Sequence, residues 1–376
     1  MTALLLVLLI FYVAFLLFVT LGTFQLYQPL QEEPEQFRYI SVIVAARNEE
    51  ENIASLIESL IQQDYPKDKY EIIVASDRST DKTDAIVKAY SKENENIRYL
   101  RIRQLAEEKG MVGKKNALNK AIEQAQGEIL LFTDADCLPG KNWLKEINRR
   151  FNRGFDVVVG YSPLLLPKKK FWQRLGYTLK ELERLSIFTV SAGTIGWNWG
   201  VTATGRNFAY RKKVFNEVGG FEEIGRIPSG DDDLFLQKVG KARKYKLTFS
   251  LSADSFVPSI ERKGLEAQYN QEKRRASKWR FYPPLIKTFS ALIFLFYLGL
   301  FVAFILALFS LFPWSIFLAI FLIKVLVDFI VVWRGAVMFK EKELLAVFPL
   351  AELIYIPYFL FFAIMGTFTK YRWVGK

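Results

Sequence analysis

The sequence lacks histidine altogether and contains a single cysteine, Cys137, among its 376 residues. The absence of histidine excludes every mechanism that uses an imidazole group. A lone cysteine excludes an internal disulfide bond and the cysteine-rich sites that bind zinc or iron–sulfur clusters. The side chains that remain offer oxygen ligands, which suit a hard divalent cation such as Mg²⁺ or Mn²⁺.

Charged residues are also absent from residues 4–26. A helix of that length reaches about 35 Å, which is enough to cross a bilayer core of about 30 Å. A signal peptide is the alternative, but the run is too long, no basic segment precedes it, and no small-residue cleavage site follows it. The pattern therefore predicts an N-terminal transmembrane anchor within residues 1–30.

Three further apolar segments, at residues 291–312, 313–333 and 344–368, predict a C-terminal membrane region of two to three helices within residues 285–376. The first two segments are typical of membrane-spanning helices. The third contains Glu352, Pro349 and Pro357, which leave a short uncharged stretch, so a kinked span and a re-entrant segment both stay open. In the second segment Lys324 and Asp328 are four residues apart, which predicts an ion pair on one helix face.

Residues 36–280 lie between these apolar ends and have the length of one soluble domain. The chain carries a net charge of +12, and residues 262–280 form a strongly basic stretch beside the next apolar segment. Because basic residues flank membrane spans on the cytoplasmic side, we expect a cytoplasmic domain on an integral protein of the inner or plasma membrane. Anionic lipid explains the basicity, and no nucleic-acid motif accompanies it, so we expect no nucleic-acid partner.

Inside this domain, short apolar runs alternate with amphipathic stretches. The predicted strands cover residues 39–46, 70–76, 97–102 and 128–133, and the predicted helices cover residues 50–63, 80–90 and 113–125. Strands that alternate with helices indicate βαβ units and an α/β fold with a mostly parallel, Rossmann-like sheet. Ligands of such sheets bind beyond the carboxyl ends of the strands, where candidate site residues are therefore sought.

Two carboxylates, Asp134 and Asp136, directly follow the fourth predicted strand. Side chains two apart at a strand exit can converge on one divalent cation, which would offset the charge that develops on a diphosphate leaving group. The structural alternative is a solvated turn, but two adjacent carboxylates repel each other without a cation. The pattern favours metal or phosphate chemistry.

Polar residues also follow the first two strands. The run Ala46–Asn52, which includes Arg47 and Glu49, opens a helix whose backbone N–H groups could face an anionic ligand. Asp77, at the tip of the second strand, is a good hydrogen-bond acceptor for a base or ribose. Each feature alone also fits an ordinary helix start or turn.

Three acids, Asp231, Asp232 and Asp233, stand at the start of a later amphipathic helix. They can cap the helix and complement its dipole. Alternatively, their mutual repulsion can raise the pKa of one carboxylate until it acts as a general base. The local sequence leaves both readings open.

Six segments together resemble the membrane-bound family 2 glycosyltransferases, a group that includes polysaccharide synthases and ceramide glucosyltransferases. These segments are SVIVAARNEEENI, EIIVASDRSTDKT, GKKNALN, TDAD, GRNFAYRKKVFNEVGGF and GDD. The resemblance implies the GT-A nucleotide-sugar-binding fold over about residues 38–280, flanked by transmembrane helices. The segment GRNFAYRKKVFNEVGGF is similar to the family's acceptor side of the site.

The resemblance also implies roles for single residues. Asp232 matches the catalytic base, and Asp134 and Asp136 match the D-x-D motif that binds the nucleotide and its Mg²⁺ or Mn²⁺. A further set matches the nucleotide-sugar-binding positions: Ala46, Arg47, Glu49, Asp77, Lys114, Asp134 and Asp231. Ser76 and Arg78 depart from the residues that many members carry beside Asp77.

A second departure affects the Q-x-x-R-W motif, which in the family contacts the diphosphate and the acceptor. In one register Gln271 and Arg274 fit, but Arg275 replaces the tryptophan. In a shifted register Arg275 comes first, Lys278 replaces the arginine, and Trp279 is retained. Both registers keep cations for the diphosphate, and only the second keeps an aromatic side chain for the acceptor.

The leading hypothesis is a membrane-anchored, inverting glycosyltransferase that moves a sugar from a nucleotide sugar, expected to be UDP-linked, to a lipid-linked or membrane-proximal glycan acceptor. A processive polysaccharide synthase is the first alternative, but few polar positions in the C-terminal segments could line a polymer tunnel. A sugar nucleotidyltransferase usually has a glycine-rich basic loop after the first strand, which is absent here. An inactive membrane scaffold would not need Asp134, Asp136 and Asp232.

Overall fold

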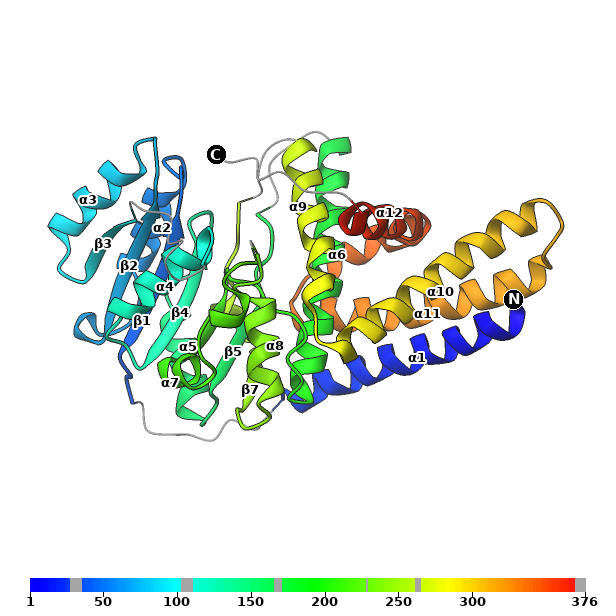
Figure 1. The fold of residues 1–376 in the computed structure, drawn as a ribbon, viewed down its shortest axis with the longest axis horizontal. Helices are drawn as coiled ribbons and strands as arrows, with labels where there is room; N and C mark the ends of the chain where they lie inside the picture. Colours follow the sequence, from blue (N-terminus) through cyan, green and yellow to red (C-terminus); the bar gives the residue numbers. More distant parts are fainter. Residues whose placement is uncertain (28–35, 103–110, 166–170, 228, 261–264, 369–376) are drawn as a thin grey trace. The chain divides into compact units, whose positions relative to one another are not determined.

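The computed structural model describes residues 1–27, 36–102, 111–165, 171–227, 229–260 and 265–368. Contacts divide the chain into two compact units. The sheet unit contains residues 26–165 and 195–261, and the helical unit contains residues 1–25, 166–194 and 262–375. The units therefore combine segments that are far apart in the sequence (Figure 1).

The sheet unit contains seven strands among its described residues, in the order β3-β2-β1-β4-β6-β5-β7. The strands are β1 (Ile40–Ala46), β2 (Tyr70–Asp77), β3 (Ile97–Ile102), β4 (Ile129–Asp134), β5 (Val157–Gly160), β6 (Phe208–Arg211) and β7 (Leu247–Ser250). The pairs β1·β2, β2·β3, β1·β4 and β5·β7 are parallel, whereas β6 runs antiparallel to both β4 and β5. The predicted α/β fold with a mostly parallel sheet is confirmed, although the sequence indicated neither the antiparallel strand β6 nor β5 and β7.

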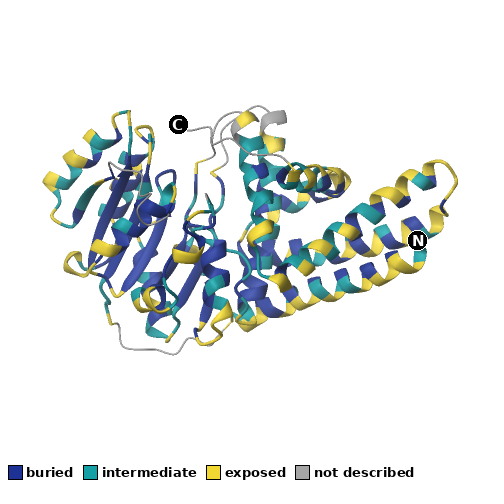
Figure 2. Ribbon diagram, in the orientation of Figure 1, coloured by how far each residue is buried: buried dark blue, intermediate teal, exposed yellow. Residues whose placement is uncertain are grey.

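Helices α2 (Ile53–Ile61), α3 (Thr83–Glu93), α4 (Lys114–Gln124), α5 (Trp143–Asn152), α7 (Lys212–Glu217) and α8 (Asp233–Lys241) accompany this sheet. Short 3₁₀ turns lie at η1 (Lys67–Lys69), η3 (Glu222–Ile224) and η4 (Ala253–Ser255). Every residue of β2 is buried, as is nearly all of β1, because helices cover both faces of the parallel part of the sheet. Figure 2 shows this buried centre in dark blue. The four predicted strands and three predicted helices are confirmed, with ends shifted by at most three residues.

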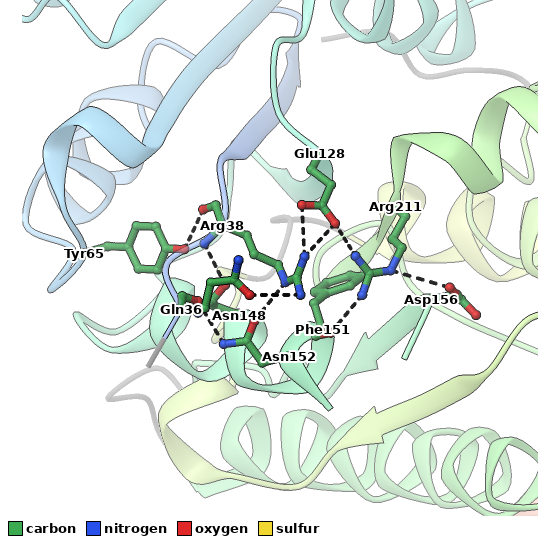
Figure 3. A network of polar contacts seen from close by, with 9 residues as sticks. All are labelled: Gln36, Arg38, Tyr65, Glu128, Asn148, Phe151, Asn152, Asp156 and Arg211. Carbon is green, nitrogen blue, oxygen red and sulfur yellow. Dashed lines mark hydrogen bonds and ion pairs between the residues drawn. The ribbon is translucent and has the colours of Figure 1, made fainter. Parts of the chain in front are cut away.

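A polar network ties together the strand ends that lie away from the predicted site (Figure 3). Glu128, directly before β4, accepts two hydrogen bonds from Arg38 at 2.9 and 3.1 Å and also pairs with Arg211 at the end of β6. Arg38 donates at 2.8 Å to Asn152 on α5, and Arg211 donates at 2.8 Å to the carbonyl of Phe151. Since every one of these contacts joins protein groups to one another, this network has a structural role.

The helical unit is built from long helices. They are α1 (Thr2–Gln25), α6 (Phe171–Gly196), α9 (Leu265–Ser277), α10 (Pro284–Leu308), α11 (Trp314–Met338) and α12 (Phe348–Phe368), with the 3₁₀ turns η5 (Lys278–Phe281) and η6 (Lys342–Val347). Among the described residues four segments are long and apolar enough to cross a membrane: Thr2–Gln25, Pro284–Leu308, Trp314–Met338 and Lys342–Phe368. The four predicted apolar segments therefore all form helices of sufficient length.

The surface of these helices is apolar as well. Large hydrophobic side chains such as Leu4, Ile10 and Leu322 are each more than 60% exposed, and Figure 2 shows such exposed positions along α1, α10 and α11. Water would disfavour so much exposed hydrocarbon, whereas lipid chains would not. The exposure pattern is what a bilayer environment requires.

Buried charges join the helices to one another inside this unit. Lys324 lies 2.8 Å from Asp328 on the same helix and also pairs with Glu352 of α12. Asp328 in turn accepts a hydrogen bond of 2.5 Å from Tyr12 of α1. The predicted pairing of Lys324 with Asp328 is confirmed, and Glu352 proves to be its second acidic partner.

The domain boundaries inferred from the sequence stay predictions. Helix α6 falls within predicted domain 36–280, yet nearly all of it packs in the helical unit, where Gly193 approaches Val19 so closely that an added Cβ would lie 2.2 Å from its carbonyl oxygen. Parts of the predictions lie outside the described residues, namely residues 28–30 of the anchor, 262–264 of the basic stretch and 369–376 of the membrane region.

Candidate functional site

The carboxyl ends of β1, β2 and β4 meet at one edge of the sheet. Ala45 is in register with Asp134 at the end of β4, and Ala46 is in register with Ser76 near the end of β2. This geometry follows from parallel pairing, which places successive strand exits side by side. The acids that follow the second and fourth strands are thereby brought to one edge, as the sequence predicted.

Lys114, at the start of α4, lies between two of the predicted acids. Its Nζ atom is 2.6 Å from Asp134 Oδ1 and 3.0 Å from Asp231 Oδ2. Burial disfavours the charge of this lysine, but Asp134 and Asp231 outweigh that effect and raise the pKa of Lys114 above its usual value. The ammonium group therefore stays charged and joins the β4 exit to the Asp231 loop.

Arg206 lies against the D-x-D carboxylates and was not among the residues chosen from the sequence. Its Nε is 3.7 Å from Asp134 Oδ2, and its Nη2 is 3.7 Å from Asp136 Oδ2. Burial opposes the charge of the guanidinium group, but Asp136, Cys137 and Asp134 outweigh it and raise the pKa of Arg206. The only available signal was an arginine in the segment GRNFAYRKKVFNEVGGF, more than 60 residues after the acids.

Asp232, the predicted base, lies beside the same cluster. Its Oδ2 accepts a hydrogen bond of 3.1 Å from the backbone N–H of Gly205, and its Oδ1 accepts one of 2.7 Å from the N–H of Asp233 at the start of α8. The helix-capping reading of these acids is thus correct for Asp232. Capping does not exclude catalysis, because the contact with Gly205 also brings the carboxylate next to Arg206.

The turn before these acids requires glycine. Gly230 has a φ of +91°, and an added Cβ would lie 2.4 Å from Leu234 Cδ1. Lys115 holds the preceding residue, because its buried Nζ donates a 2.6 Å hydrogen bond to the carbonyl of Ser229. The adjacent lysines 114 and 115 therefore have different roles, one in the charge cluster and one in positioning its loop.

A pocket opens beside the cluster within the sheet unit. Lys114 and Asp231 form part of its polar wall, while Phe132, Phe208 and Phe221 belong to its apolar wall. Its free volume is about 10 Å³, which is room for about one water molecule, so it is a small cavity beside the charge cluster and does not itself define a ligand site.

The acids at the β4 exit fit a divalent metal ion. One guanidinium group contacts both Asp134 and Asp136, so the two carboxylates face a common position. Among the described residues, no group of three or more Asp, Glu, His or Cys side chains could complete a cage. Mg²⁺ typically binds through one or two carboxylates plus substrate phosphates, and this pair matches that pattern.

The predicted nucleotide-binding residues on β1 and β2 lie at the same sheet edge. Ala46 ends β1, Arg47 is exposed, and Glu49 is buried with its N–H donating at 2.8 Å to Thr83. Asp77 accepts two hydrogen bonds from Arg78, at 2.8 and 3.1 Å. A nucleotide base that used Asp77 would therefore have to share it with Arg78, and this role stays a prediction.

The predicted acceptor and diphosphate residues belong to the helical unit. Gln271, Arg274 and Arg275 lie on α9, and Lys278 and Trp279 lie on η5. Within that unit Arg275 pairs with Glu183 of α6 and, at 2.8 Å, with Glu272, while Trp279 donates at 2.8 Å to Thr367 of α12. Contact of these residues with a donor or acceptor stays a prediction.

Comparison with protein families gives a match to the family described as Glycosyl transferase family 2 over residues 41–219. Glycosyltransferase AglE of Haloferax volcanii is 30% identical over 217 residues, which cover 56% of this chain and 64% of that protein. A beta-monoglucosyldiacylglycerol synthase of Nostoc sp. is 28% identical over 251 residues, which cover 63% of this chain and 48% of that protein. The matches thus span about half to two thirds of these relatives.

Among solved structures, a mannosyltransferase of Pyrobaculum calidifontis in complex with GDP-Man and Mn²⁺ has a similar fold. The TM-score is 0.56 with 19% sequence identity, and the alignment covers 96% of this chain and 98% of the other. At this identity the similarity concerns the fold alone. It extends over nearly the whole chain, helices included.

Proposed function

Because residues 41–219 match the family described as Glycosyl transferase family 2 and the fold is similar to that of a solved mannosyltransferase, we propose that the protein transfers a sugar from a nucleotide sugar to an acceptor at the membrane. The observation that carries this proposal is the convergence of Lys114 and Arg206 on Asp134, Asp136 and Asp231 at the carboxyl edge of the sheet. Such a cluster has both the cations that a diphosphate needs and the carboxylates that a metal ion needs.

The donor is a nucleoside diphosphate sugar, and we expect UDP. In this proposal Asp77 and the residues Ala46–Glu49 receive the nucleoside, and Lys114 pairs with the diphosphate. Asp134 and Asp136 would hold Mg²⁺ or Mn²⁺, which when bound offsets the charge developing on the leaving group. The mannosyltransferase of similar fold was solved with GDP-Man and Mn²⁺, so a GDP-sugar is the donor to test beside UDP-sugars.

Asp232 acts as the general base in this proposal. It removes the proton from the acceptor hydroxyl while the oxygen attacks the anomeric carbon, and the bond to the diphosphate breaks on the opposite side. A single displacement of this kind inverts the anomeric configuration. The support is the position of Asp232 beside Gly205 and Lys114, within the charge cluster.

The acceptor is a lipid or a lipid-linked glycan. One relative is named a beta-monoglucosyldiacylglycerol synthase, and four helices of this chain are long and apolar enough to cross a membrane. Together these observations favour a hydroxyl group presented at the bilayer surface. Gln271, Arg274, Arg275, Lys278 and Trp279 remain the proposed acceptor and diphosphate residues from the helical unit.

The test uses the purified chain in detergent with a panel of UDP- and GDP-sugars, Mn²⁺ and native lipid extract. We expect release of a nucleoside diphosphate with one donor, dependent on lipid, and a product that extracts into organic solvent. Reactions with Asp136→Asn serve as the matched control for contaminating activity. Release of pyrophosphate would instead indicate a nucleotidyltransferase, and a high-molecular-mass product would indicate a polysaccharide synthase.

We further propose that the sheet unit faces the cytoplasm and that the N-terminus lies on the other side of the membrane. The support is the basic stretch at residues 262–280, whose placement beside a span follows the positive-inside tendency. Cysteine labelling of intact cells tests this orientation, with Cys137 replaced and a cysteine introduced at Ser91. An impermeant thiol reagent should leave Ser91→Cys unlabelled until the membrane is opened, and labelling before that step would reverse the proposed topology.

A further inference from the structure

We propose that Arg206 is an internal counter-ion of Asp134 and Asp136 that weakens the binding of a free divalent cation and strengthens the binding of a free nucleoside diphosphate. This inference rests on the metal site of the proposed function and adds a residue that controls it. In the presence of Arg206, the divalent cation binds tightly only together with the diphosphate, so the two ligands bind as a pair.

The contacts of Arg206 are those of a cation facing a pair of acids. Two different nitrogens of one guanidinium group lie 3.7 Å from Asp134 Oδ2 and 3.7 Å from Asp136 Oδ2. At this length they are ion pairs without hydrogen bonds. The Nε atom of Arg206 is buried and has no hydrogen-bond partner in the described part of the chain. A buried donor without a partner is costly, and an acceptor from a ligand bound beside Asp134 and Asp136 would satisfy it.

Arg211 shows what a purely structural arginine looks like five residues later in the same segment. Its side chain is 17% exposed, close to the 15% of Arg206. Unlike Arg206, Arg211 donates a 2.8 Å hydrogen bond to the carbonyl of Phe151 and pairs closely with Glu128. The two arginines are buried to a similar extent, but Arg211 is held by close protein acceptors, whereas the Nε–H of Arg206 is available to a ligand.

The charge balance gives the direction of the effect. Lys114 is shared between Asp134 and Asp231, so Arg206 is the cation that lies against both Asp134 and Asp136. A divalent cation that binds alone at these two carboxylates therefore meets a positive group that repels it. A diphosphate that binds with the cation brings negative charge beside Arg206, and its oxygens can accept the unpartnered Nε–H of Arg206.

The test measures the two ligands separately on the full chain in detergent. Binding of Mn²⁺ alone is followed by electron paramagnetic resonance of the free ion, and binding of UDP or of GDP in EDTA by calorimetry. Arg206→Met should bind Mn²⁺ about tenfold more tightly, a change of about 1.4 kcal/mol, and the nucleotide in EDTA about tenfold more weakly. Structural damage would weaken both, so the opposite signs identify the counter-ion role.

Two further variants complete the test. Arg206→Lys keeps the charge and should stay within a few-fold of the wild type for Mn²⁺, which also covers the case in which Arg206→Met does not fold. Arg211→Gln removes a structural arginine and should leave both affinities unchanged. Unchanged or weaker Mn²⁺ binding in Arg206→Met, or tighter Mn²⁺ binding in Arg206→Lys, would overturn the inference. Mn²⁺ binding and nucleotide binding are both measured without sugar transfer. The proposed function can therefore fail in its own assay without changing the outcome of this test.

Discussion

The two ends of strand β4 carry similar groups in different arrangements. Glu128 stands directly before the strand and Asp134 ends it, about 20 Å away at about 3.3 Å per residue. Glu128 accepts hydrogen bonds from Arg38 at 2.9 and 3.1 Å and pairs with Arg211, within the network of Figure 3. Asp134 faces Arg206 at 3.7 Å, across a distance too long for a hydrogen bond.

This difference separates structural from functional charge. At the start of β4 the arginine donors are used by protein acceptors, and the group ties β1, β4, β6 and α5 together. At its end, Arg206 lies 3.7 Å from Asp134 and from Asp136, and its buried Nε has no hydrogen-bond partner in the described part of the chain. Sites that must accept a ligand cannot be fully satisfied without it. Substitutions at either end of β4 test this contrast.

Asp136→Asn should abolish turnover and the metal-dependent part of nucleotide binding. The change removes one of the two carboxylates that face a common position, while the amide keeps the shape of the side chain. Donor turnover and UDP or GDP titrations with and without Mn²⁺ measure it. The thermal midpoint should stay near the wild-type value, and full activity of the wild type in excess EDTA would contradict the metal role.

Asp232→Asn should lower turnover by about 10²- to 10⁴-fold and leave nucleotide affinity nearly intact, because a general base acts on the acceptor proton. The amide oxygen of asparagine can keep one of the two backbone hydrogen bonds that Asp232 accepts, from Gly205 or from Asp233, whereas its NH₂ group cannot accept the other. Steady-state rates and nucleotide calorimetry on the same preparation measure the two effects. If donor binding fell as far as turnover, Asp232 would be a donor-site or structural residue.

Glu128→Gln should lower the free energy of unfolding and leave the affinities for nucleotide and Mn²⁺ unchanged, which is the opposite of the effect expected for Asp136→Asn. It removes the charge that Arg38 and Arg211 share, and a partly exposed charge network of this kind contributes about 1 kcal/mol. Chemical denaturation gives the stability, and nucleotide and Mn²⁺ titrations give the affinities. A change in Mn²⁺ affinity would mean that the two ends of β4 are coupled and the contrast is wrong.

Cys137 should show the smallest effect, which is very slow reaction with iodoacetamide in the folded protein. Its side chain is fully buried, and burial together with the neighbouring Asp136 raises the pKa of the Cys137 thiol. Since the thiolate is the reactive form, the folded state protects it at neutral pH. Mass spectrometry against a denatured control measures the rate, and rapid labelling of the folded protein would show that the β4 exit opens readily.

Much of the fold follows from local pattern. Some elements are long enough for their hydrophobic pattern to predict a strand or a helix. These are the continuous apolar runs of β1, β2 and β4 and the uncharged stretch at the N-terminus. Strands β5, β6 and β7 have only four residues each, too few to show a period, so neither they nor the antiparallel direction of β6 could be predicted. The predicted start of α10, at residue 291, was also late, because the first turns of this helix contain polar residues that resemble a loop.

The sequence by itself determined the chemistry that this protein can hold: oxygen ligands, carboxylates at strand exits and apolar helices, because residue type and spacing are local properties. Only the tertiary structure decided which charges from distant segments meet. Arg206 reaches Asp134 and Asp136 because β6 pairs antiparallel with β4 and carries the preceding loop back to the strand exit. Glu352 reaches Lys324 because two helices pack together. Contacts between segments that are distant in the sequence depend on how strands and helices pack together, and local sequence patterns do not contain that information.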